Sequence, residues 1–157
     1  MNFAHVHLLL NHLPVLGTLF GVLLAIAAML RRSRDLEAAA LWVFVLTAVV
    51  TVPVYFTGEP AEEVVESMPG VTEDAIEEHE ESALVSLSAV EALGLLAVAG
   101  LFLGRGGRVA PPLLRPATVI VAIAATALMA WTANLGGQVR HTEIRPASLE
   151  QQGESEH

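Results

Sequence analysis

The chain has 157 residues, of which 54% are hydrophobic and only 16% are charged, and its formal net charge is −9 at pH 7. This composition is too apolar for an ordinary soluble domain, and the acidic balance argues against nucleic acid as a partner. The absence of cysteine excludes disulfides, thiolate metal sites, iron–sulfur clusters and haem attached through a Cys-x-x-Cys-His motif.

Four apolar segments, each close to the roughly 20 residues that a bilayer-spanning helix needs, predict an all-α integral membrane four-helix bundle. Helices are expected because backbone polar groups in lipid must be satisfied within the segment. The membrane domain is expected to cover 1–146, and the polar, aperiodic composition of 147–157 predicts a disordered tail. No cleavable signal peptide is expected, since no basic region precedes the first apolar run. The expected spans are about 8–30, 38–56, 83–103 and 117–135.

Six of the eight arginines lie in the connections after the first and third predicted spans, and lysine is absent. The positive-inside rule places both connections in the cytoplasm. Both termini and the loop 57–82 then face the periplasm or the cell exterior. The sequence therefore predicts a multi-pass protein of the bacterial cytoplasmic membrane, with the lipid bilayer as its first partner.

The outward loop 57–82 holds ten carboxylates and neither lysine nor arginine. Residues 61–68 and 72–81 are expected to form short amphipathic helices over the outer end of the bundle, separated by a turn at Pro69 and Gly70. Thr72 is the predicted N-cap of the second helix. The loop is also a candidate docking surface for a basic soluble redox carrier, because complementary charge speeds encounter.

Five of the six histidines are predicted to gather at this outer end. Imidazoles are rare beside hydrocarbon, so the cluster predicts a functional site. At 100° per residue, His5 and His12 share one helix face, and His7 points about 200° away from His5. His12 lies roughly 6 Å inside the first span at 1.5 Å per residue, which makes it the expected buried ligand. The five are His5, His7, His12, His79 and His141.

Two prolines lie at the same predicted depth, Pro14 in the first span and Pro53 in the second. Each removes a backbone donor and pushes against the preceding turn, which kinks a helix. We expect these kinks to open a cavity at the outer mouth of the bundle.

Glu91 is the only ionisable residue well inside a predicted span. It is expected to face the bundle interior, where it either joins the helices through a polar layer or takes up a proton linked to a redox centre. Its expected hydrogen-bond partners are the mid-span threonines Thr18, Thr47 and Thr126.

The histidine cluster favours haem b, because imidazoles on facing helices can bind the iron from both sides. His12 and His79 are the first expected axial pair, and His7 and His141 the second, with His5 and His141 as an alternative pairing. The expected function is that of a b-type cytochrome-like electron-transfer protein or redox subunit rather than an enzyme.

Two other functions fit the same residues. A copper, zinc or iron ion could be held by the histidines together with carboxylates from the outward loop. In a purely structural or interaction module, the histidines would instead cap helix ends and contact headgroups. The carboxylates concerned are Glu59, Glu63, Glu78 and Glu81.

Four motifs resemble a family of small bacterial four-helix membrane proteins known as a domain of unknown function. They are NHLPVLG at 11–17, PVYFTGEPAEE at 53–63, HEE at 79–81 and WTANLGGQVRH at 131–141. The resemblance runs from residue 2 to about residue 145. It implies no assigned reaction, but some members of the broader group are similar to, or fused with, cytochrome or rubredoxin-like electron carriers. A homodimer is compatible with all of these features.

Overall fold

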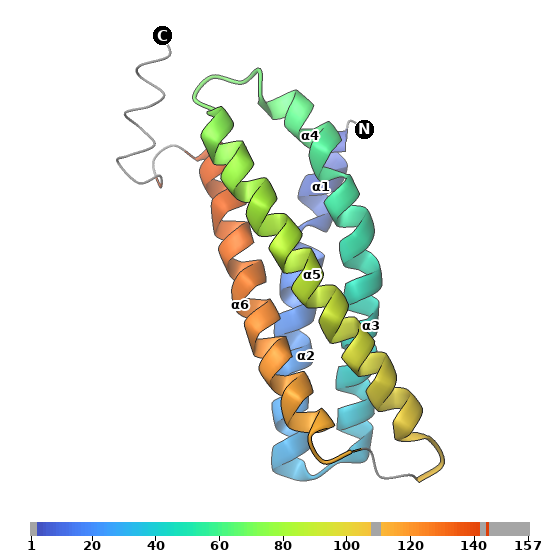
Figure 1. The fold of residues 1–157 in the computed structure, drawn as a ribbon. Helices are drawn as coiled ribbons and strands as arrows, with labels where there is room; N and C mark the ends of the chain where they lie inside the picture. The colour runs from blue at the N-terminus through green and yellow to red at the C-terminus, as the bar shows by residue number, and fades with distance from the viewer. Residues whose placement is uncertain (1–2, 108–110, 142–143, 145–157) are drawn as a thin grey trace.

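The computed structural model describes residues 3–107, 111–141 and 144, and every regular element among them is helical (Figure 1). Four helical segments are long and apolar enough to cross a membrane, which confirms the predicted all-α architecture of four candidate spans. The predicted tail at 147–157 lies outside the described residues. The elements are α1 (Phe3–Leu10), α2 (His12–Arg31), α3 (Arg34–Phe56), α4 (Gly58–Val65), α5 (Glu73–Leu103), the 3-10 helix η1 (Arg105–Gly107) and α6 (Leu114–Arg140).

The long helices pack side by side, with α2 against α3 and α6, and α5 against α3 and α6. The short helices α1 and α4 pack against each other at one end, beside the start of α5 and the end of α6 (Figure 1). We call this the histidine end, after His7 and His79. The opposite end carries the α2–α3 turn and the start of α6, and we call it the arginine end, after Arg32 and Arg115.

Small side chains let the helices approach closely. A Cβ built on Gly21 would lie 2.2 Å from Cε1 of Phe44, a fully buried ring, and one built on Gly17 would lie 2.3 Å from Oγ1 of Thr47. Large apolar side chains instead point outward, among them Leu46, which is 60% exposed, and Leu95, which is 72% exposed. Small residues inside and large apolar residues outside are the arrangement expected of helices surrounded by lipid.

The predicted first span is interrupted in the structure. It forms two helices, α1 and α2, which meet at Asn11, three residues before Pro14. Pro14 has no N–H to donate to the carbonyl of Leu10, so the helical hydrogen-bond pattern is interrupted at this point. Asn11 nevertheless keeps helical angles, with φ −60° and ψ −22°, and Ala4–Arg31 forms one candidate span. The kink expected at Pro14 stays a prediction, and α3 continues through Pro53 to Phe56.

The acidic loop is more helical than predicted. Its second expected helix is not a separate piece but the first turns of α5, because no glycine or proline interrupts residues 73–93. Thr72 is the N-cap as predicted, although its side chain makes no capping hydrogen bond. The first loop helix, α4, begins at Gly58 rather than at residue 61. Pro60 is tolerated in its first turn, because a backbone N–H at that position would have no acceptor within the helix.

Candidate functional site

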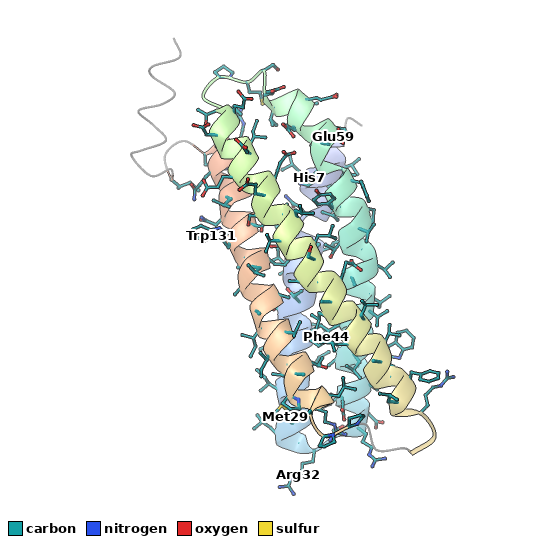
Figure 2. All side chains as sticks on the ribbon, in the orientation of Figure 1. His7, Met29, Arg32, Phe44, Glu59 and Trp131 are labelled. Carbon is teal, nitrogen blue, oxygen red and sulfur yellow. The ribbon has the colours of Figure 1, made fainter. Side chains whose placement is uncertain are left out.

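His7 of α1 is held by the junction between α3 and α4. Its Nδ1 lies 3.1 Å from Oγ1 of Thr57 and 3.2 Å from the carbonyl oxygen of Val54, and the ring is partly buried (Figure 2). The Thr57 hydroxyl donates its own proton to the Val54 carbonyl at 2.7 Å. Both neighbours of Nδ1 are therefore acceptors, so Nδ1 carries the hydrogen. In the neutral ring, Nε2 is then the nitrogen with a lone pair.

His79 of α5 is oriented in the same way by α6. Its Nδ1 lies 3.1 Å from the carbonyl oxygen of Thr132, which can only accept, so Nδ1 is again the donor and Nε2 carries the lone pair. Gly136 makes room for this ring, because a Cβ built there would lie 2.9 Å from Cε1 of His79. A glycine one turn beyond Thr132 thus lets the imidazole lie against the backbone of α6.

The two imidazoles form a matched pair. They come from α1 and α5, and both are partly buried. Each is fixed through Nδ1 by a backbone carbonyl of another helix, and each neutral ring keeps its lone pair on Nε2. Metal-binding histidines are anchored in this way, since the hydrogen bond at one nitrogen fixes the ring and makes the other a better ligand.

A polar layer supports His79. Thr132 Oγ1 lies 2.6 Å from Oγ of Ser82 and 2.8 Å from Oγ of Ser86. His79, Ser82 and Ser86 are spaced by three and four residues, so they share the face of α5 that meets α6. The two serines are site residues that were not predicted from the sequence. Their helical spacing from His79, three and seven residues along the chain, is the signal that identifies them.

The expectation that His12 is buried is wrong, because its side chain is exposed; its role as a ligand stays a prediction. The prediction that His5 and His12 share one helix face and that His7 points away from it is confirmed, since His5 and His12 are exposed and His7 is partly buried. The buried face of α2 includes Pro14, seven residues after His7, whereas His12 shares its face with Leu16, which is 59% exposed. Facing rather than depth therefore decides which ring enters the bundle. His141 is exposed and forms the C-cap of α6.

Glu91 does not have the predicted partners. Its Oε1 is buried without a hydrogen-bond partner, about 18 Å along α5 from His79 at 1.5 Å per residue. Each mid-span threonine hydroxyl donates to a carbonyl of its own helix, so the predicted donation to Glu91 is wrong. These bonds run from Thr18 to Val15, from Thr47 to Val43 and from Thr126 to Ala122.

Within residues 3–107, 111–141 and 144, no group of three or more His, Cys, Asp or Glu side chains is placed to hold a metal ion. Two cavities of the described chain lie at the arginine end, and neither is lined by Pro14 or Pro53. Comparison of the chain with protein-family models, with curated proteins and with solved structures found no match.

Proposed function

We propose that this protein is a b-type cytochrome-like membrane protein that transfers electrons, alone or as a redox subunit, with His7 and His79 as the axial ligands of haem b. The observation that carries the proposal is the matched hydrogen bonding of the two rings, which leaves Nε2 of each available to iron. Haem, when bound, supplies reversible one-electron chemistry. The chain would supply the two ligands and their orientation.

The set of donors favours haem over a single metal ion. The porphyrin itself provides four nitrogens, so two imidazoles complete the coordination of its iron. A copper, zinc or iron ion without a porphyrin commonly needs three or four protein ligands. The two partly buried histidines supply only two donors, and the described residues contain no larger group.

The neighbours of the two rings have defined roles in this proposal. Thr57 and the Val54 carbonyl fix the plane of the His7 ring, and the Thr132 carbonyl fixes that of His79. Gly136 sets how closely His79 approaches α6. Ligands locked by such partners are oriented before the cofactor binds, which reduces the entropy lost on binding.

The absorption spectrum of the detergent-purified protein, oxidised and then reduced with dithionite, tests the proposal. We expect a Soret band and the sharp reduced bands of a low-spin bis-histidine haem. His7→Ala and His79→Ala should each abolish the low-spin form, and His12→Ala, the matched control on the same face as exposed Leu16, should retain it. Helicity measured by circular dichroism shows whether each variant is folded.

A colourless preparation from haem-supplied cells would leave a structural or interaction module as the better reading. A spectrum lost in His12→Ala but kept in His7→Ala would restore the pair His12 and His79. A metal ion found by elemental analysis without a Soret band would favour the copper, zinc or iron alternative.

The proposed location is the bacterial cytoplasmic membrane, with the histidine end facing the periplasm. The clustering of arginines in the opposite connections supports this orientation. Because the chain has no cysteine, Ser67→Cys and Leu113→Cys provide single labelling sites at exposed positions of the two ends. An impermeant maleimide applied to intact cells should label the first and spare the second; the reverse pattern would invert the topology.

The acidic surface beside the proposed haem suits a basic soluble electron carrier. Exposed carboxylates lie on α4 and on the first turns of α5, and Figure 2 shows Glu59 near the histidine end of the molecule. Electrostatic attraction raises the rate of encounter and is screened by salt. We expect electron transfer to a basic carrier to slow as ionic strength rises, and a salt-independent rate would contradict this docking surface.

A further inference from the structure

The arginine end contains a cavity that the proposed function does not use. It has a volume of about 570 Å³ and lies between the α2–α3 turn and the start of α6. This volume falls in the range of about 300–1,000 Å³ typical of ligand pockets. Its lining includes Met29, Arg32, Ser33, Arg34 and Arg115, and Figure 2 shows Met29 and Arg32 at this end of the molecule.

The charge of the cavity suits an anion. Three guanidinium groups line it, and its one carboxylate, Glu37, is paired with Arg115 at 2.5 Å between Oε1 and Nε. The positive charges of Arg32 and Arg34 are therefore not offset within the lining. Guanidinium is the side chain best suited to phosphate, because its planar donors can bind two oxygens at once.

A second cavity of about 260 Å³ adjoins the first and shares Arg34, Glu37 and Arg115 with it. Its other walls are apolar except for Arg105 and Thr118, and they include Leu41 and Phe44 of the bundle core. Exposed apolar side chains also flank the arginines, with Met29 60% and Leu113 79% exposed. The first cavity, lined by arginines, thus lies beside the second, more apolar cavity at the end of the spanning helices.

We infer that these two cavities bind an anionic phospholipid, with the phosphate among the arginines of the first cavity and part of an acyl chain along the apolar walls of the second. A free phosphate ion would use only the first cavity, whereas a lipid uses both. Basic pockets between spanning helices recognise anionic headgroups in this way. The inference does not depend on haem.

Binding of phosphatidylglycerol and phosphatidylcholine to the detergent-solubilised full chain, measured by native mass spectrometry, tests the inference. Arg32 has φ 51° and ψ 37°, a left-handed conformation that favours glycine, so Arg32→Gly removes the charge without straining the backbone. Arg34→Gln removes the second charge. The matched control is Arg31→Gln, which is exposed one residue earlier and lines neither cavity.

We expect phosphatidylglycerol to bind in preference to phosphatidylcholine, and its affinity to fall about fivefold for each of the two guanidiniums removed. Arg31→Gln should change the affinity within about twofold, since Arg31 lines neither cavity. Equal binding of the two lipids, or an equal loss in Arg31→Gln, would overturn the inference. Full competition by inorganic phosphate or glycerol phosphate would identify a soluble anion as the ligand instead.

Discussion

Replacing each of two adjacent glycines in α6 by alanine should have opposite effects on the stability of the protein. At Gly136, an alanine Cβ would lie 2.9 Å from Cε1 and 3.3 Å from Nδ1 of His79, closer than side chains pack. At Gly137, the nearest atom outside the helix backbone is Cδ1 of Ile144 at 3.6 Å, an ordinary contact. The pair separates the effect of helix propensity from the effect of crowding the histidine.

The magnitudes follow from three terms. Replacing glycine by alanine inside a helix stabilises it by about 1 kcal/mol, and this term is common to both variants. At Gly136, crowding costs about 1–3 kcal/mol. Displacing the ring of His79 also weakens its 3.1 Å hydrogen bond to Thr132, which contributes about 0.5–1.5 kcal/mol. We therefore expect Gly136→Ala to destabilise by about 1–3 kcal/mol and Gly137→Ala to stabilise by up to about 1 kcal/mol.

The free energy of unfolding can be measured by titrating the detergent-solubilised protein with dodecyl sulfate and following helicity by circular dichroism. Equal stability of the two variants, or a more stable Gly136→Ala, would refute the close packing of His79 against α6. In haem-loaded protein, Gly136→Ala should also shift the Soret band, because the ligand ring must move, while Gly137→Ala should leave the spectrum unchanged.

Three further substitutions test the packing and the polar groups, each by the same unfolding assay. Gly21→Ala should destabilise by about 1–3 kcal/mol, because its Cβ would overlap the buried ring of Phe44; a neutral result would contradict that contact. Thr132→Val removes the hydroxyl shared by two serines and should cost about 1 kcal/mol, whereas Ser88→Ala, at an exposed hydroxyl, should change little; equal effects would argue against the polar layer. Glu91→Leu should leave stability unchanged or raise it by about 1 kcal/mol, since it removes a buried oxygen without a partner; a large loss would reveal a partner for that carboxyl.

The predicted helices agree with the structure wherever hydrophobic length decides them. The four candidate spans were evident because an apolar run of about 20 residues has few alternatives to a helix in lipid. The predicted and observed helix boundaries differ where a single residue, rather than the length of the apolar segment, decides them. Pro14 interrupts the hydrogen-bond pattern of the first span, and α5 includes a predicted loop helix because no glycine or proline follows Thr72 before Gly94.

The candidate site was harder to predict because the position of a histidine along its helix does not determine whether its side chain faces the bundle interior. Counting residues from the helix start placed His12 deepest, and this choice ignored the rotation of the helix. The buried positions Pro14, Thr18 and Gly21 mark the inward face of α2, and His7 lies seven residues before Pro14 on that face. In a membrane bundle, small residues identify the interior more reliably than large apolar residues, because lipid solvates the latter equally well.

The sequence by itself determined that the chain is helical, that four segments are long enough to span a bilayer, and that five histidines belong near the ends of those segments. Only the tertiary structure decided which imidazoles turn inward and which nitrogen each presents. The rotation of a helix about its axis depends on how it packs against its neighbours, and the tautomers of His7 and His79 depend on carbonyls supplied by α3 and α6. Those acceptors lie 47 and 53 residues away along the chain, so no local pattern could have specified them.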